Sequence, residues 1–316
     1  MSGKHLGPII RPADAAGIAE AARLLAAGAP VAVPTETVYG LAARADSPAA
    51  VAAIYAAKGR PSFNPLIVHV ADLAQAEMLA EFDERARLLA AQFWPGALTM
   101  VLPLKEGARI APNVTAGLAT IALRCPAHPV MRAVLAATGL PLAAPSANRS
   151  GGVSPTSAAH VAASLDGRIE LVLDGGPCEA GLESTIVALR SDGSWQQLRP
   201  GPVTGARIVS VLGPASSARP DAAVEAPGQL ASHYSPGKPL RLDAHDAQAD
   251  EFLLGFGILA GDYNLSPTAD LGEAAARLYA GLYRAAESPQ PRIAVVKLPA
   301  DGLGATIYDR LRRAAA

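Results

Sequence analysis

Residues 34–70 read PTETVYGLAARADSPAAVAAIYAAKGRPSFNPLIVHV, and this stretch decides the fold that we expect. The apolar runs at 30–34 and 66–70 are typical of short buried strands. Between them, the serine-proline pair at 47–48 predicts the start of a helix that ends near Gly59. Polar side chains stand where these elements end, and α/β proteins usually build their sites at such positions.

The alternation of apolar runs with helical patterns continues along much of the chain and predicts an α/β fold, in which some neighbouring strands are antiparallel. A stretch rich in Pro, Ser, Gly and Ala then interrupts the pattern and predicts a linker. We expect a first domain at 1–212, a linker at 213–238 and a small C-terminal α/β domain at 239–316. In the last domain we expect strands at 257–260 and 293–297 around a helix at 270–286.

The composition excludes several classes of protein. The chain has 316 residues, half of them hydrophobic, which suffices for one large or two smaller domains. No apolar run is long enough to cross a membrane, and the two cysteines form no metal-ligand pattern and no disulfide framework. We therefore expect a cytoplasmic protein without a membrane partner. The net charge of −1 gives no sign of a nucleic-acid partner.

Familiar nucleotide-binding signatures are missing or weak. The P-loop pattern GxxxxGK[ST] does not occur. Residues 255–260, GFGILA, match a loose GxGxxG/A, but they lie in a strand-like run without the strand-helix context of a dinucleotide site. Close packing of a strand against a loop is the better interpretation. The HExxH and GxSxG motifs are also absent.

Lys58 and Arg60 stand at the end of the predicted helix and have two interpretations. Cations at a helix C-terminus interact favourably with its dipole. Alternatively, a lysine and an arginine on the rigid turn that contains Asn64 form a clamp for a polyphosphate, with Lys as a point charge and Arg as a fork. Lysine occurs only five times in the chain, which favours a specific use of Lys58.

Three other positions also have both a structural and a functional interpretation. The segment 146–148, Ser-Ala-Asn, is an ordinary turn or a loop whose donors hold phosphate or ribose. Arg124 ends a predicted strand. It is either a surface ion-pair partner or a bidentate partner of a substrate carboxylate. His69, between two valines, is a buried strand histidine or a site residue.

Taken in order, the motifs resemble those of the threonylcarbamoyl-AMP synthase family in its long form. The similar stretches are PTETVYGL, KGRPxxNPL, LRxP, PSANRSG and GLESTIV, followed by HYSP, NLSPTADLGEAAARLYAGL and GLGATIYDRLRRAA. The resemblance implies a YrdC-like domain, with a twisted open mixed sheet. It also implies a small Rossmann-like C-terminal domain, joined by the long linker.

The resemblance also implies an activity. The family forms L-threonylcarbamoyl-adenylate and pyrophosphate from L-threonine, bicarbonate or CO2, and ATP, and the product serves tRNA modification. This chemistry needs positioning and charge neutralisation rather than a protein nucleophile. The implied partners are ATP, threonine, bicarbonate, downstream threonylcarbamoyl-transfer proteins acting on tRNA, and a possible RNA contact. Mg2+ would arrive with ATP, without a metal site in the protein.

The resemblance assigns roles to residues of this chain. The family signature KxR…SxN corresponds to Lys58, Arg60, Ser146 and Asn148, which we expect to be catalytic. The expected ATP contacts are Arg60, Asn64, Thr120, Ser146, Ser154, Arg199 and Tyr234. The expected threonine contacts are Thr37 (with Thr35 as the near alternative), His69, Arg124, Ala144 and Ser184. Arg124 would bind the threonine carboxylate, and Tyr234 would make the linker a lid over the nucleotide.

Two alternatives compete with this interpretation. The first is carbamoyl transfer to another acceptor, as in hydrogenase-maturation proteins that contain this domain, but the chain lacks their acylphosphatase and zinc-finger parts. The second is a double-stranded RNA or ribosome-binding module without catalysis. The intact KxR, SxN and HYSP motifs and the near-neutral charge weigh against such a module.

Overall fold

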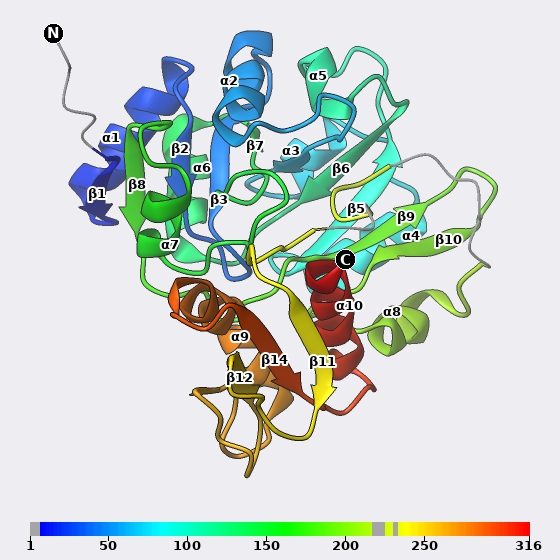
Figure 1. Ribbon diagram of the computed structural model, residues 1–316. Coiled ribbons are helices and arrows are strands. Elements are labelled where there is room, and N and C mark those ends of the chain that lie inside the picture. Colours follow the sequence, from blue (N-terminus) through cyan, green and yellow to red (C-terminus); the bar gives the residue numbers. More distant parts are fainter. Residues whose placement is uncertain (1–6, 217–224, 230–232) are drawn as a thin grey trace, which may run out of the picture.

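Two sheets organise the chain in the computed structural model, which describes residues 7–216, 225–229 and 233–316 (Figure 1). The larger sheet has ten strands in the order β1-β8-β2-β3-β7-β4-β6-β5-β9-β10 and mixes parallel with antiparallel pairs. The smaller sheet has the order β11-β14-β12-β13, and all its pairs are parallel. The predicted α/β class with a mixed sheet and a small second sheet is confirmed.

The strands of the larger sheet are β1 (Ile9–Pro12), β2 (Val31–Val33), β3 (Gly40–Arg44), β4 (Ile67–His69), β5 (Leu98–Pro103), β6 (Thr120–Arg124), β7 (Leu142–Ala143), β8 (Leu171–Asp174), β9 (Thr185–Leu189) and β10 (Trp195–Arg199). Its helices are α1 (Ala15–Ala26), α2 (Pro48–Lys58), α3 (Leu73–Glu77), α4 (Glu84–Phe93), α5 (Pro112–Thr115), α6 (Pro129–Thr138), α7 (Ala158–Ser164) and α8 (Gly205–Leu212). The C-terminal unit contains β11 (Leu240–Ala244), β12 (Glu251–Gly255), β13 (Tyr263–Asn264), α9 (Leu271–Glu287), β14 (Arg292–Val296) and α10 (Leu303–Ala315).

The helix predicted inside the opening stretch forms as its end signals require. The Ser47 side chain accepts a hydrogen bond from the amide of Ala50, and Pro48 takes the first helical position of α2. Gly59 ends the helix in the left-handed conformation, with φ of 60°. Lys58 is thus the last residue of α2, and Arg60 lies in the segment that leads from α2 to β4.

The two faces of the larger sheet are covered differently near β4, β5 and β6. Val68, Met100 and Leu123 point into the main core beneath helices such as α2 and α4. Ile67 and Val101 alternate with them and point to the opposite face. That face meets a segment of the linker, since Ala226 packs in the same small apolar cluster. A site on this face is therefore covered by the linker rather than by helices of the first domain.

The C-terminal unit packs against the rest of the chain through helices α9 and α10 (Figure 1). Their apolar residues share one core with Val38, Val153 and Leu182 of the larger part. Gly181 shows how close this contact is: a Cβ there would lie 2.4 Å from the Cα of Ala276 in α9. Among the described helices, none combines the length and the apolar character needed to cross a membrane.

One strand prediction is wrong. Residues 257–260 form a tight turn after β12 rather than a strand, and Ile258 at its tip is fully exposed. Gly257 has φ of 60°, and a Cβ on Gly255 would lie 2.1 Å from the carbonyl oxygen of Leu259. The glycines serve a chain reversal with close backbone approach, as the packing interpretation of this motif expected. Of the predicted linker, residues 217–224 and 230–232 lie outside the described residues.

Candidate active site

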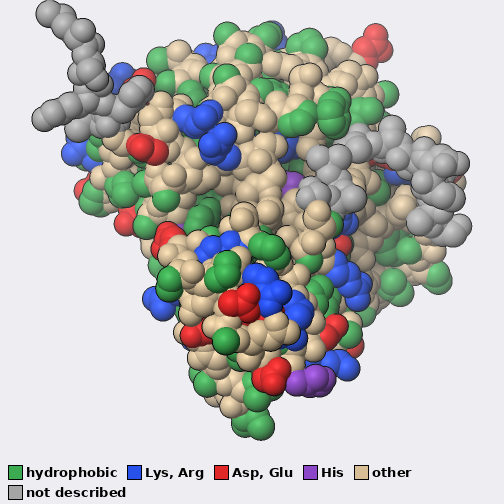
Figure 2. All heavy atoms as spheres, in the orientation of Figure 1, with side chains coloured by type: hydrophobic (Ala, Val, Ile, Leu, Met, Phe, Trp, Pro, Cys, Tyr) green, Lys and Arg blue, Asp and Glu red, His purple; other side chains and the backbone are tan. Residues whose placement is uncertain are grey.

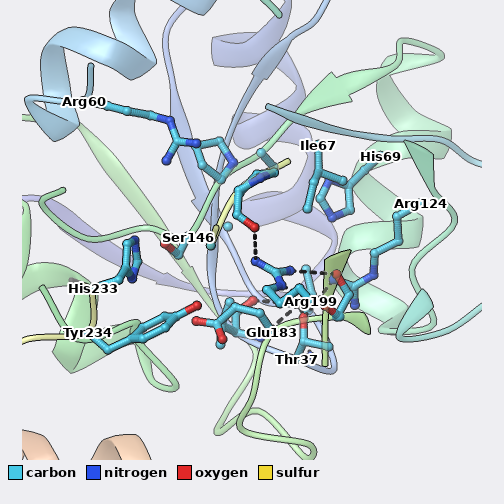
Figure 3. Close-up of a pocket in the computed structure, with 18 residues that line it drawn as sticks. Thr37, Arg60, Ile67, His69, Arg124, Ser146, Glu183, Arg199, His233 and Tyr234 are labelled. Carbon is cyan, nitrogen blue, oxygen red and sulfur yellow. Dashed lines mark hydrogen bonds between the residues drawn. The ribbon is translucent and has the colours of Figure 1, made fainter. Parts of the chain in front are cut away.

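A pocket lies on the sheet face that the linker covers, at the ends of β4 and β6 (Figure 3). All the predicted threonine contacts line it: Thr35, Thr37, His69, Arg124, Ala144 and Ser184. Four of the predicted ATP contacts line it too: Arg60, Ser146, Arg199 and Tyr234. In Figure 3, Arg60 and Tyr234 stand on one side, and His69 and Arg124 on the other. Members of both predicted sets thus line one pocket, and the sets meet where Arg199 donates to Ser184.

Arg124 is held in place at the end of β6 by three partners. Its Nη2 lies 2.7 Å from Oε1 of Glu36, its Nη1 donates to Thr37 Oγ1 at 2.8 Å, and its Nε donates to the carbonyl of Gly96 at 3.1 Å. Burial raises the pKa of Glu36, but the charge and hydrogen bond of Arg124 outweigh this effect and lower the pKa to about 2. The fixed guanidinium is oriented by an ionised carboxylate.

Thr35 and Thr37 are arranged differently from each other. The Thr35 hydroxyl donates to the carbonyl of Val38 at 2.6 Å and lies 2.8 Å from the Thr37 hydroxyl. Thr37 in turn accepts from Arg124. Thr35 therefore holds the turn after β2 together, whereas Thr37 stands next to the guanidinium. Both residues line the pocket, and which of them contacts threonine stays a prediction.

Two arginines of the pocket are bound through carbonyl groups and a hydroxyl rather than carboxylates. Arg60 donates to the carbonyls of Asn64 and Pro65 at 3.3 and 3.0 Å. Arg199 donates to the carbonyl and hydroxyl of Ser184 and to the carbonyl of Pro227. Burial lowers the pKa of Arg60 to about 10, so it stays charged at neutral pH. These positive charges keep their capacity to neutralise an anionic ligand.

Lys58 does not line this pocket, although its neighbour Arg60 does. Its ammonium donates at 2.6 Å to the carbonyls of both Ser146 and Asn148, and at 3.3 Å to Oδ1 of Asn148. Asn148 then donates to two carbonyls of its own loop, those of Arg149 and Gly152. Lys58 and Asn148 hence fix the loop that presents Ser146 to the pocket. The KxR and SxN motifs meet here through the Lys-to-carbonyl contacts.

Three further predicted ATP contacts also lie outside the pocket lining. Thr120 starts β6 opposite Pro103, and Ser154 donates to Glu183 Oε1 at 2.6 Å. The buried Asn64 stands beside Arg60, and its Oδ1 has no hydrogen-bond partner among the described residues. Their direct contact with a nucleotide stays a prediction.

His69 presents an unsatisfied nitrogen at the pocket. The side chain is buried, and its Nδ1 has no hydrogen-bond partner in the part of the chain that the structure describes. Burial, with the nearby charge of Arg124, lowers the pKa of His69 to about 3, so the ring is neutral at physiological pH. Unpartnered buried polar atoms are rare, and contact of His69 with a ligand stays a prediction.

Several residues of the site were not identified from the sequence. Glu36 stands inside the quoted motif, but its ion pair with Arg124 depends on strands that are distant in the chain. Gly228 of the linker lies so close to Arg199 that a Cβ would approach its Cδ to 2.8 Å. Glu183 also lines the pocket, as does His233. Gly228 has a φ of 86°, which favours glycine. The glycine itself is therefore the signal that the sequence offers for this contact.

The arrangement can hold an anionic ligand beside a small amino acid. No group of three or more His, Cys, Asp or Glu residues able to bind a metal ion occurs among the described residues. Of the serines that line the pocket, Ser184 has its hydroxyl bound to Thr99 and Arg199 rather than to a base. Positioning and charge neutralisation are the chemistry that these side chains offer.

Comparison with known proteins agrees with this geometry. A family described as "Telomere recombination" matches residues 23–201, and one described as "Threonylcarbamoyl-AMP synthase, C-terminal domain" matches residues 203–316. The threonylcarbamoyl-AMP synthase of Bacillus subtilis is 42% identical over 323 residues, which cover 94% of this chain and 92% of the relative. The chain belongs to the threonylcarbamoyl-AMP synthase family. The predicted family is therefore confirmed.

Two comparisons with a protein of an archaeon show similarity over almost the full length of both chains, first in sequence and then in structure. The enzyme of Pyrococcus abyssi is 38% identical over 321 residues, covering 93% of this chain and 92% of the relative. The crystal structure of P. abyssi Sua5 complexed with L-threonine matches with a TM-score of 0.87 and 35% identity, covering 98% and 96% of the two chains. An RNA-binding module without catalysis is not favoured by these relatives.

Proposed function

We propose that this protein forms L-threonylcarbamoyl-adenylate and pyrophosphate from L-threonine, bicarbonate or CO2, and ATP. One observation carries the proposal: a single pocket joins the predicted threonine contacts to two arginines, Arg60 and Arg199, that are bound to oxygens of the chain rather than to carboxylates. Relatives named for this activity match almost the full chain, and one of them was solved with L-threonine.

The reaction divides into two bond-forming steps. The amine of threonine adds to CO2 and loses a proton, which gives a carbamate. A carbamate oxygen then attacks the α-phosphorus of ATP in line, the bond from that phosphorus to the bridging oxygen breaks, and pyrophosphate leaves. Arg124 would bind the threonine carboxylate, while Arg60 and Arg199 would neutralise charge on the phosphates.

Mg2+ enters this proposal only as the counter-ion of the ATP phosphates. Glu183, which lines the pocket, and Glu36, which lies behind Arg124, are both engaged by arginines, at 2.8 and 2.7 Å. They do not fit a protein-held magnesium site, which usually needs one or two free carboxylates. No step of the reaction is assigned to a protein-bound ion.

The size of the pocket supports the lid role proposed for Tyr234. Its free volume is about 50 Å3, whereas small-molecule sites usually offer about 300–1,000 Å3. Tyr234, Pro227 and Gly228 of the linker form part of its wall. We infer that the linker moves outward to admit ATP and returns to cover it, as expected for lids that exclude water.

The product is a reactive mixed anhydride of a carbamate and a phosphate, so a transfer reaction must consume it. Downstream threonylcarbamoyl-transfer proteins acting on tRNA are the proposed consumers. On the C-terminal part of the face in Figure 2, Lys and Arg side chains lie among Asp and Glu side chains, so this part of the surface gives little support for a direct RNA contact. Such mixed charge does not favour strong binding to a phosphate backbone.

The function is tested by pyrophosphate release. The purified protein is incubated with ATP, Mg2+ and bicarbonate, with L-threonine, L-serine or no amino acid. We expect release to depend on threonine and to be lower with serine, since the extra methyl group contributes about 1 kcal/mol in a fitted apolar contact. Release that does not depend on an amino acid would contradict the proposal, and equal use of serine would contradict the pocket assignment.

A further inference from the structure

Helix α10 brings a buried arginine to the wall behind the pocket. The Arg310 side chain is 0% exposed, and its Nε lies 2.8 Å from Oε2 of Glu183. Its Nη2 donates to the carbonyl of Pro200 at 2.9 Å, and its Nη1 donates to Asp309 at 2.6 Å. Glu183 lines the pocket and Arg310 does not, so the arginine reaches the site only through its partner.

Glu183 is a carboxylate in the wall of a pocket that we propose for a polyphosphate. Ser154 and Tyr279 donate to it along with Arg310, at 2.6 Å for Ser154 and 2.9 Å for the nearer Tyr279 contact. Burial raises the pKa of Glu183, but the charges of Arg310 and Arg199 and these hydrogen bonds lower it to about 2. The group is therefore an anion whose repulsion of phosphate must be cancelled by a neighbouring cation.

The same arginine also contacts the proposed lid. Its guanidinium lies 5.3 Å from the centre of the Tyr234 ring, and Tyr279 of α9 stacks on that ring at 5.7 Å. Figure 3 shows the Tyr234 hydroxyl pointing toward Glu183. Two residues of the C-terminal unit thus hold two lining residues, one of the first domain and one of the linker.

We infer that Arg310 is a positioning residue for the nucleotide end of the pocket: it neutralises and fixes Glu183, with help from Tyr279, and so keeps that end electropositive for a polyphosphate. The inference rests on the proposed function for the identity of the ligand. The inference gives the C-terminal unit a defined role in the site, although neither Arg310 nor Tyr279 lines the pocket itself.

The inference predicts a selective effect on ATP. Arg310→Gln removes the cation that binds Glu183 directly and leaves Arg199 as the nearby positive charge that must balance this anion as well as the triphosphate, so KM for ATP should rise about tenfold or more. The threonine end has its own charge pair, Arg124 with Glu36, and KM for threonine should stay within about twofold. A purely structural role would instead lower kcat or thermal stability and leave the ratio of the two KM values unchanged.

Steady-state kinetics with four variants tests this. The double variant Glu183→Gln/Arg310→Gln removes both charges and should return KM for ATP to within about threefold of the wild type. Arg310→Lys, which keeps the charge, should also retain most of the ATP affinity. The matched control is Arg277→Gln on α9, since Arg277 pairs with Glu273 at 2.9 Å on the surface and should leave both KM values unchanged. An unchanged KM for ATP in Arg310→Gln, or no recovery in the double variant, would overturn the inference.

A further variant covers the case in which Arg310→Gln does not fold. Tyr279→Phe removes only the hydroxyl that donates to Glu183 and should raise KM for ATP about two- to fivefold without affecting threonine. An unchanged KM for ATP in that folded variant would overturn the inference. If the wild-type protein makes no adenylate, the proposed function fails by itself. The same variants are then compared by the Kd for ATP from calorimetry, which does not require the reaction.

Discussion

Individual side chains of the site could be predicted to different extents. The motif residues Arg60, Arg124 and Ser146 line the pocket, because each lies at the end of a secondary-structure element or shortly after it. The orientation of Lys58 could not be predicted, since the carbonyls that it binds come from a loop about ninety residues later. Two cations on a rigid turn predicted a phosphate clamp, whereas the ammonium of Lys58 binds the carbonyls of the Ser146 loop.

Arg60 gives the simplest residue-scale prediction. Arg60→Gln should raise the Kd for ATP about tenfold to a hundredfold, because a charge-assisted contact to phosphate contributes about 1.5–3 kcal/mol. Calorimetric titration with ATP measures the change. Arg44→Gln is the control, since Arg44 pairs with Asp46 outside the pocket. Equal affinities of wild type and Arg60→Gln would remove Arg60 from the nucleotide site.

His69 predicts a pH dependence of stability. Its pKa is about 3 in the folded protein, whereas an unfolded histidine has a pKa of about 6.5. Between these values the unfolded state binds a proton that the folded state does not, so the free energy of unfolding decreases as the pH falls. At about pH 5 this single group lowers it by about 2 kcal/mol relative to neutral pH.

Urea unfolding at a series of pH values checks this prediction. His69→Gln should lose stability less steeply than the wild type as the solution is acidified, even if it is less stable at neutral pH. The partly buried His160 and His233 also have lowered pKa values, and they contribute equally to both proteins. Parallel curves for the two proteins would contradict the assignment of a neutral His69.

At the scale of elements, the sequence predicted those whose ends carry strong local signals. The helix α2 follows from a serine cap, a first-position proline and a final glycine. The turn at 257–260 was taken for a strand because its apolar side chains carry no sign that the backbone reverses. Local patterns report capping and burial, but the path of a loop depends on the backbone it meets.

The linker segment at 225–229 makes a sharp prediction at this scale. Gly228→Ala places a methyl group 2.8 Å from Cδ of Arg199 and forces a non-glycine residue to φ of 86°. Arg199 must shift, so the Kd for ATP should rise by about tenfold. Gly237→Ala is the matched control: its φ is 77°, but a Cβ there meets nothing within 4 Å. Equal ATP affinity in both variants would contradict a role for the linker in placing Arg199.

At the scale of the whole molecule, the sequence predicted two α/β parts joined by a linker but gave no account of how they meet. The contact depends on Gly181, whose missing side chain lets the backbone of α9 approach. It also depends on Arg310 and Tyr279, which reach the buried Glu183. Such pairs join residues about a hundred positions apart, and local patterns in a single sequence do not reveal them.

The closeness of this contact can be tested by stability. Gly181→Ala puts a methyl group 2.4 Å from the Cα of Ala276, and neither backbone can yield locally. The free energy of unfolding should fall by about 1–3 kcal/mol more than in Gly176→Ala, which has a φ of 82° and no atom within 4 Å of the added Cβ. Equal losses in the two variants would show that the two parts do not pack as closely as described.

The central claim is that one pocket joins threonine, a carbonate-derived carbon and AMP. The most direct measurement incubates the protein with ATP, Mg2+, L-threonine and bicarbonate that carries a heavy carbon isotope, followed by mass spectrometry. We predict an adenylate whose mass includes threonine and one heavy carbon. Its yield should fall in Arg60→Gln. Pyrophosphate release without such a product, or an adenylate that lacks the labelled carbon, would contradict the account.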